Sequence, residues 1–223
     1  MVTDQRQEIV VPAGVFRRRD LRNAANVGRS LKKIRITQRA HPAELRSRRC
    51  SRRKFIAIAL LIILVGFGAS TARLFVWPQQ GMPSRVDAIV MLNGPGDRLD
   101  TALGLARAHR APTLVISLGS PWWYTKACAA KIPKVTVICF IPDPRTTRGE
   151  AEFAGRLARR YHWHSIVVVT STPQGTRARL RVGRCVSGKI YLIGAPLPPS
   201  QWPHAIAYEW GATIKALVLQ RSC

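Results

Sequence analysis

Acidic residues are scarce in this chain, which has 11 Asp and Glu against 36 Lys and Arg and a formal net charge of +25. Both parts of the chain share the imbalance: residues 1–54 hold 16 basic and 4 acidic residues, and residues 55–223 hold 20 and 7. A similar balance occurs in nucleic-acid-binding proteins, whose affinity comes largely from neutralised phosphates. We nevertheless expect no nucleic-acid partner, because the N-terminal charges lie directly before an apolar run and so suggest a membrane as the partner.

Closely spaced cysteine pairs, which zinc sites favour, are missing from the sequence. His162 and His164 flank Trp163 with no cysteine beside them. We therefore predict no metal site, and we predict no bound cofactor. No internal repeat is visible.

Charge is absent from residues 55–72, a run of eighteen (FIAIALLIILVGFGASTA). At about 1.5 Å per residue, such a run approaches the ~30 Å thickness of a bilayer's hydrocarbon core, and residues 74–77 extend it past Arg73. We predict a transmembrane helix over residues 55–77 that acts as a signal anchor. Two alternatives stay open: a buried core helix, and a cleaved signal peptide, because residues 66–72 are rich in small side chains.

Basic residues cluster directly before this apolar run. They are Arg46, Arg48, Arg49, Arg52, Arg53 and Lys54. Only Arg73 and Arg85 lie close on the other side, so the positive-inside rule places the N-terminus in the cytoplasm and the C-terminal part outside the plasma membrane. Membrane lipid is thus a predicted partner. We expect residues 1–54 to form a basic, largely disordered tail, with a short helix over residues 20–34 as the alternative.

After a linker over residues 78–85, the chain alternates apolar runs with segments of helical spacing. The predicted strands are residues 87–92, 113–117, 135–141, 165–170 and 189–193. The predicted helices are residues 98–109, 121–130, 147–161, 173–185 and 203–219. Continuous apolar strands indicate a parallel sheet covered on both faces, since a sheet with one wet face alternates. For residues 86–223 we predict an α/β, Rossmann-like three-layer domain, with a five-stranded parallel sheet in the order 3-2-1-4-5.

Glycines and polar residues gather where the predicted strands end, which is where such sheets bind ligands. The turn 93–98 (NGPGDR) follows the first strand, and its N–H groups could hold an anion. It lacks the Gly-x-Gly-x-x-Gly spacing, so an ordinary strand-to-helix turn is equally compatible. Ser117 ends the second strand. After the third, Thr147 and Glu150 stand three apart, which fits either a helix-capping box or ligand contact.

The segment after the fourth strand is predicted to begin a helix, with an arginine about one helical turn after its start. Ser171 or Thr172 would cap this helix, and Pro173 suits its first turn. Gln174 and Arg177 lie near its N-terminus on one face, where a guanidinium is well matched to phosphate or carboxylate. A solvated arginine face is the alternative.

Two groups of candidate site residues follow. The candidate acid–base residues are Glu150 and Asp97. The candidate ligand-binding residues are Asn93, Gly94, Gly96, Arg98, Ser117, Thr147, Ser171, Gln174 and Arg177.

Three segments of the chain resemble the YdcF/SanA/ElyC-like envelope family over about residues 86–195. They are DAIVMLNGPGDR at the first strand and turn, TTRGEA at the Thr/Glu segment, and VVVTSTPQGTRA at the fourth strand. The chain departs from the family pattern at Gln174, where many members carry histidine, and at Gly149, which separates Arg148 from Glu150. Glutamine has no proton to exchange near neutral pH, so it could not replace an acid–base histidine.

The resemblance implies a membrane-anchored bacterial domain that acts in cell-wall or surface-polysaccharide biogenesis, without implying a reaction. An anionic envelope intermediate or a lipid-linked phosphate is the ligand we expect. The domain could process this ligand as an enzyme, bind it without changing it, or tether envelope proteins. The oligomeric state is not indicated.

Four of the five cysteines follow the apolar run, in a compartment where disulfides persist if the domain is exported. Cys185 ends a predicted helix and Cys223 ends the chain, so among three pairings we favour Cys185–Cys223 with Cys128–Cys139. Four unpaired core thiols are the alternative. Cys50 should stay reduced or carry a palmitoyl chain.

Three aromatic residues at 122–124 (WWY) follow the second strand. They could stack on a sugar, enter the outer leaflet or pack in the core.

Overall fold

A computed structural model of the chain describes residues 42–119 and 128–223. Most of the predicted tail, the alternative helix at residues 20–34 and the aromatic residues 122–124 lie outside these ranges. The predicted helix at residues 121–130 lies largely outside them.

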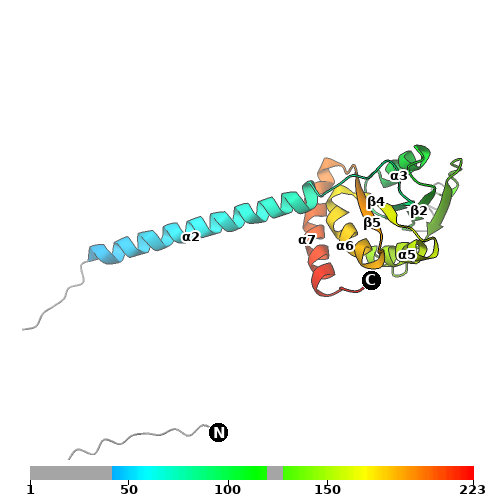
Figure 1. The fold of residues 1–223 in the computed structure, drawn as a ribbon. Coiled ribbons are helices and arrows are strands. Elements are labelled where there is room, and N and C mark those ends of the chain that lie inside the picture. The colour runs from blue at the N-terminus through cyan, green and yellow to red at the C-terminus, as the bar shows by residue number, and fades with distance from the viewer. Residues whose placement is uncertain (1–41, 120–127) are drawn as a thin grey trace, which may run out of the picture. The chain divides into compact units, whose positions relative to one another are not determined.

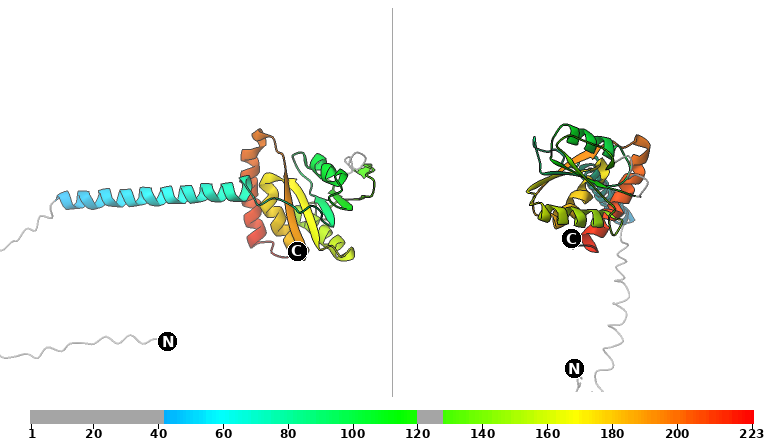
Figure 2. Two further views of the ribbon diagram at one scale, coloured as in Figure 1. Left: turned by 45° about the horizontal axis from the view of Figure 1, so that its top comes forward. Right: turned by 90° about the vertical axis from the view of Figure 1, so that its right-hand side faces the viewer.

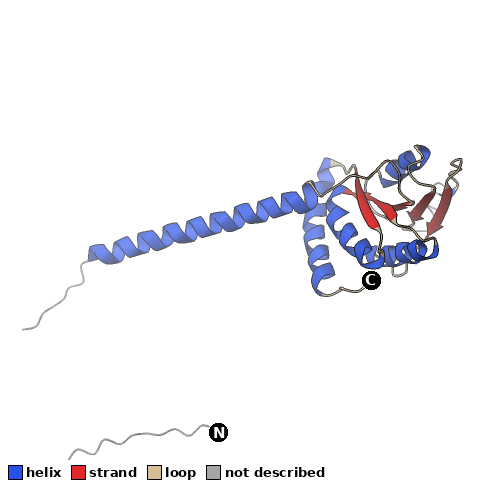
Figure 3. Cartoon of the chain, viewed as in Figure 1, coloured by secondary structure: helices blue, strands red, loops and turns tan. Residues whose placement is uncertain are grey.

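Five parallel strands form a single sheet in the order β3-β2-β1-β4-β5, which confirms the predicted α/β class and strand order (Figure 3). The strands are β1 (Ala88–Met91), β2 (Thr113–Ser117), β3 (Thr136–Phe140), β4 (Ser165–Ser171) and β5 (Lys189–Ala195). Each bound lies within two residues of its prediction. The order reverses at β1, which pairs with β2 on one side and β4 on the other, so a crevice is expected beyond the carboxyl end of β1.

Helices cover both faces of the sheet, which explains why the strands are apolar throughout (Figures 1 and 2). The helices are α3 (Arg98–Arg107), α5 (Thr147–Arg160), α6 (Gly175–Cys185) and α7 (Trp202–Val218). Along β1, Ala88 and Val90 belong to a buried cluster with residues of α5 and α6, whereas Ile89 and Met91 belong to one with residues of α3. Side chains of successive strand residues point to opposite faces, so both faces of β1 are core.

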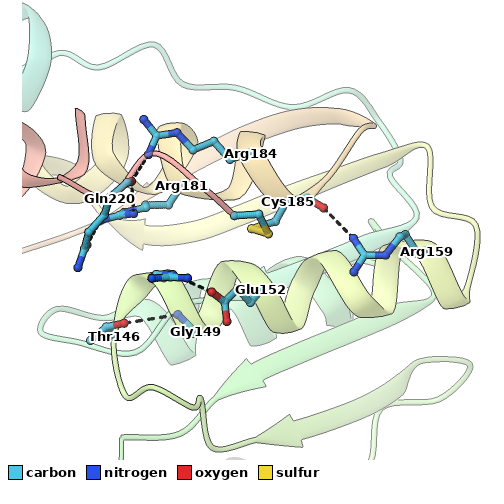
Figure 4. The surroundings of a disulfide bond; sticks show 10 residues. Thr146, Gly149, Glu152, Arg159, Arg181, Arg184, Cys185 and Gln220 are labelled. Carbon is cyan, nitrogen blue, oxygen red and sulfur yellow. Dashed lines mark hydrogen bonds and ion pairs between the residues drawn. A yellow bond between two sulfur atoms is a disulfide. The ribbon is translucent and has the colours of Figure 1, made fainter. Parts of the chain in front are cut away.

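Both favoured disulfides are present. Cys128 and Cys139 are joined with their Cα atoms 6.1 Å apart, and Cys185 and Cys223 with theirs 4.9 Å apart. The second bond ties the segment after α7 to the end of α6 (Figure 4). The backbone carbonyl of Gln220, in the same segment, accepts a hydrogen bond from Arg181 at 2.8 Å. The alternative of four unpaired thiols is therefore wrong.

One helix, α2 (Pro42–Thr71), contains the apolar run and continues as a π-helical turn, η3 (Ala72–Val76). Residues Ser51–Val76 are long and apolar enough to cross a membrane, and no residue in the most apolar 18-residue stretch of this span is buried by the rest of the protein. Phe55 is 70% exposed and Leu64 is 67% exposed. This exposure contradicts the alternative of a soluble core helix.

The domain begins without a spacer after this helix. Phe75 is fully buried, and the hydroxyl of Thr176 on α6 donates to the carbonyl of Leu74. The segment predicted as a linker then runs along the edge of the sheet, where Gly81 bridges Leu192 of β5 in antiparallel fashion. The segment 78–85 thus contacts the sheet's edge at Gly81 as well as connecting the two parts of the chain.

Candidate functional site

A cavity of about 710 Å³ lies at the carboxyl ends of the strands, where the sequence predicts a crevice. Its walls come from the turn after β1, the ends of β2 and β3, the start of α5, the β4–α6 junction and the first half of α7. We call it the strand-end cavity. Eight predicted site residues line it: Asn93, Gly94, Arg98, Thr147, Glu150, Ser171, Gln174 and Arg177.

Three other predicted site residues do not line the cavity. Asp97 is exposed at the start of α3 and makes no side-chain cap there. Gly96 shapes the turn behind the wall: its φ of +95° and the carbonyl oxygen of Pro196, 2.6 Å from where a Cβ would stand, exclude a side chain. Ser117, the last residue of β2, is buried and does not reach the cavity.

The turn after β1 is built around the guanidinium of Arg98, whose side chain is 2% exposed. Its N–H groups donate to the carbonyl oxygens of the turn at Leu92, Asn93 and Pro95. The remaining Nη2 group donates to Ser171 Oγ and Gln174 Oε1, each at 2.9 Å. These five bonds use all five donors, so Arg98 locks the β1 turn to the β4–α6 junction.

The charge of Arg98 nevertheless acts on the cavity. Burial lowers the pKa of Arg98 to about 10, while the carboxylates of Glu150 and Glu209 oppose that shift. A pKa of about 10 keeps the group cationic near neutral pH. Arg98 therefore contributes a positive charge at the cavity but has no N–H group left to bind a ligand.

Arg177 has hydrogen-bonding capacity left. Its Nε and Nη2 form a two-point ion pair with Glu209 at 2.6 and 2.7 Å, and its Nη1 donates to Thr147 Oγ1 at 2.8 Å. Burial alone would lower the pKa of Arg177, but the hydrogen bonds and charge of Glu209 outweigh it and raise that pKa. Among the described residues, three of its five N–H groups are used, which leaves two for a ligand.

Thr147 and Gln174 complete the floor of the cavity. Thr147 Oγ1 accepts from Arg177 and from Gln174 Nε2, the latter at 3.2 Å, so its own proton can be donated to a ligand. Gln174 is 6% exposed and bridges Arg98 to Thr147. Gln174, which stands where many members of the resembled family have histidine, thus connects two other site residues.

Glu150 is a buried carboxyl group on the first turn of α5, with 3% of its surface exposed. One oxygen accepts the backbone N–H of Asn93 at 2.6 Å. Burial raises the pKa of Glu150, and the Asn93 N–H and the charges of Arg98 and Arg177 only partly offset the rise. The Ser117 hydroxyl faces the same carboxyl group, but no hydrogen bond joins it to any described residue. Glu150 therefore keeps its proton to a higher pH than a free carboxyl does.

The capping alternative for Thr147 and the capping role predicted for Ser171 are both wrong. Thr146, not Thr147, caps α5, and its hydroxyl accepts from the N–H of Gly149 (Figure 4). Thr147 is the first helical residue and its hydroxyl turns to Arg177 instead. Ser171 makes no side-chain cap, because its hydroxyl accepts from Arg98. In both cases a tertiary contact with an arginine holds the hydroxyl.

The first half of α7 supplies a wall that the sequence reasoning missed. Its cavity-lining residues include His204, Tyr208 and Glu209. The Tyr208 ring centroid lies 5.7 Å from Cζ of Arg177. Glu209 is the single acidic residue of the mostly apolar α7, and this isolated carboxylate was the available signal. A lone acid in an apolar helix needs a buried partner, and Arg177 is that partner.

Metal chemistry has no evident location in residues 42–119 and 128–223, where no three His, Cys, Asp or Glu residues are grouped to hold an ion. Comparison with known proteins gives no match to a family model, to a curated protein or to a solved structure. The resemblance to the YdcF/SanA/ElyC-like family therefore stays a prediction.

Proposed function

We propose that the protein is a single-pass membrane protein whose α/β domain lies outside the plasma membrane and binds a phosphate-bearing ligand in the strand-end cavity. The ligand class we infer is an anionic intermediate of cell-wall or surface-polysaccharide biogenesis. The observation that carries the proposal is Arg177, a buried guanidinium with two N–H groups left over beside the free proton of Thr147. Such a pair of donors suits a phosphate oxygen.

The charges buried around the cavity also favour an anion. Arg98 and Arg177 bring two positive charges, and Glu209 in its ion pair brings one negative charge. Burial raises the pKa of Glu150, so this carboxyl ionises less readily than a free one and offsets the two guanidiniums less. Buried positive charge without a full partner is costly until a counter-ion neutralises it.

The location outside the membrane rests on two further observations. The basic cluster before α2 favours a cytoplasmic N-terminus if α2 spans the membrane. Two disulfides in the domain favour an oxidising compartment, because such bonds are rare in the cytosol. Both arguments support the same orientation.

Binding is the function that the geometry supports best, and catalysis on the same ligand is the second candidate. The raised pKa of Glu150 favours it, because a carboxyl that keeps its proton to a higher pH can donate that proton to a leaving oxygen. Asp97 lies outside the cavity, and we give it no role in such a step. Incubating the full chain with a polyprenyl diphosphate and analysing the recovered ligand by mass spectrometry separates the two: a binding module returns it intact.

The test of binding uses three variants of the full chain in detergent, titrated with inorganic phosphate by calorimetry. Arg177→Met should weaken binding roughly tenfold to a hundredfold, because a hydrogen bond to a charged group is worth about 1.5–3 kcal/mol. Glu209→Gln should tighten it roughly threefold to tenfold, because a competing carboxylate is lost. Arg179→Met is the matched control, since Arg179 lies on the same helix but outside the strand-end cavity.

Opposite effects of two variants in one ion pair separate ligand binding from misfolding. Loss of folding would weaken binding in both. Equal phosphate affinity in wild type, Arg177→Met and Arg179→Met would contradict the proposed site.

A further inference from the structure

An apolar stripe runs along α7 on a side that the described chain leaves uncovered. Ile214, Leu217 and Val218 are 53%, 50% and 56% exposed, and Trp210 is half-buried. Their spacing of four, three and one residues places all four on one side of a helix. We call these four residues the α7 stripe.

Another side of α7 holds the helix against the domain. Glu209, Thr213 and Ala216 are buried there, and Glu209 pairs with Arg177 of α6. The Cys185–Cys223 bond ties the segment after α7 to the end of α6. Because α7 is fixed on this side, it cannot rotate to bury the stripe in the domain's own core.

The stripe is continuous with the candidate membrane span. Trp210 stacks on Phe67 of α2 with ring centroids 5.2 Å apart and an interplanar angle of 16°. Its indole N–H donates to Thr71 Oγ1 at 3.1 Å, and its ring meets the edge of Phe75. The same tryptophan thus touches residues inside the span and the first buried residue of the domain.

We propose that the α7 stripe is embedded in the outer leaflet of the membrane, so that lipid covers it. This inference rests on the part of the proposed function that makes α2 a membrane span. Phe67 stands nine residues before the end of that span at Val76, roughly 13 Å along a helix, and Trp210 lies at the level of Phe67. A helix held at that depth must bring its neighbouring apolar side chains to the lipid interface.

The chemistry of the surrounding residues fits a lipid interface. Tryptophan is enriched at that boundary, where its ring meets apolar chains and its N–H keeps a polar partner. Lys215 and Arg221 are exposed near the stripe, and long basic side chains can reach lipid phosphates from an apolar surface. Phe75 belongs to the last turn of the span and is also buried in the domain, so the domain cannot stand away from the membrane.

The embedded helix would place the strand-end cavity beside the lipid headgroups. The first half of α7 forms a cavity wall through His204, Tyr208 and Glu209, while its second half carries most of the stripe. A phosphate that is linked to a membrane lipid could then enter the cavity while its lipid chain stays in the bilayer. The inference therefore narrows the proposed ligand to a lipid-linked phosphate.

Photocrosslinking of the full chain in lipid nanodiscs tests the docking directly. Leu217→p-benzoylphenylalanine places the reactive group on the stripe, and Arg107→p-benzoylphenylalanine on α3 is the control on the other face of the sheet. Both positions are exposed, so the changes should not disturb folding. We expect a lipid adduct at position 217 and none at position 107.

Each other result overturns the docking. An adduct of position 217 with a second copy of the chain would make the stripe a dimer interface. No lipid adduct at 217 in protein that resists alkaline extraction would show an anchored domain without docking. Release of the protein from membranes by alkaline extraction would contradict both the membrane span and the docking.

A second measurement separates this inference from the proposed function. Leu217→Asp should raise the Kd for a polyprenyl phosphate in nanodiscs and leave the Kd for inorganic phosphate unchanged. An unchanged Kd for both ligands would overturn the docking role. Failure of inorganic phosphate to bind wild type would overturn the anion site while leaving the crosslinking result intact.

Discussion

At the scale of single residues, the site depends on hydroxyl groups that accept hydrogen bonds from arginines instead of capping helices. Thr146 and Thr147 are adjacent, and the sequence pattern alone fits Thr147 with Glu150 either as a capping pair or as ligand contacts. The hydroxyl of Thr147 does not cap α5, because it accepts a hydrogen bond from Arg177 in the buried site. A local pattern cannot reveal this, because the competing partner lies 30 residues away in the chain.

Glu150 gives the clearest residue-scale prediction, which concerns stability against pH. Its folded-state pKa is raised above the ordinary 4.5, so the folded protein retains a proton that the unfolded chain has lost. Stability therefore falls as pH rises through the interval above 4.5. Glu150→Gln removes this loss, so its melting temperature relative to wild type should rise as pH increases through that interval.

Differential scanning of the full chain between acidic and neutral pH measures this trend. Glu152→Gln is the matched control on the same helix, since Glu152 pairs with Arg148 outside the strand-end cavity. A melting-temperature difference for Glu150→Gln that stays constant with pH would show that Glu150 titrates as an ordinary carboxyl.

At the scale of elements, the limits of the strands and of the last helix were predictable, but the side of α7 that meets the cavity was not. The apolar run at residues 113–117 matches β2 because continuous β-branched and aliphatic residues bounded by polar ones leave little choice of limits. The limits of α7 were also predicted to within a residue at each end. The side of α7 that meets the cavity depends on how it packs against α6, so Glu209 and His204 could not be assigned to the site.

The Cys185–Cys223 bond gives the element-scale prediction. It closes a loop with a sequence separation of 38, which corresponds to roughly 4 kcal/mol of chain entropy removed from the unfolded state. Cys223→Ser should lower the free energy of unfolding by about 2–4 kcal/mol under oxidising conditions. Cys185→Ser should give a similar loss, and the double variant should lose little more, because both changes break one bond.

Denaturant unfolding followed by near-UV circular dichroism provides these values. Cys50→Ser controls for the removal of a thiol, because Cys50 takes part in neither disulfide. Wild-type stability in Cys223→Ser would mean that the bond does not hold α7 in place.

At the scale of the whole molecule, the sequence leads to the fold and to most of the cavity, and the structure adds how the charges are shared. Eight of eleven predicted site residues line the strand-end cavity, because loops after parallel strands converge on one edge of the sheet. The roles of these residues depend on how they are buried. All N–H groups of Arg98 bond to the protein, whereas Arg177 keeps two N–H groups for a ligand. The account thus combines an anchor, an anion cavity and a helix that connects them.

The orientation of the domain is the claim on which the envelope role and the lipid-linked ligand both depend. A reporter fused after Cys223 tests it most directly in intact cells. An alkaline phosphatase fusion, which requires an oxidising compartment, should be active, and a green fluorescent protein fusion that fluoresces only in the cytoplasm should be dark. A fluorescent fusion with an inactive phosphatase would place the domain in the cytoplasm and contradict the account.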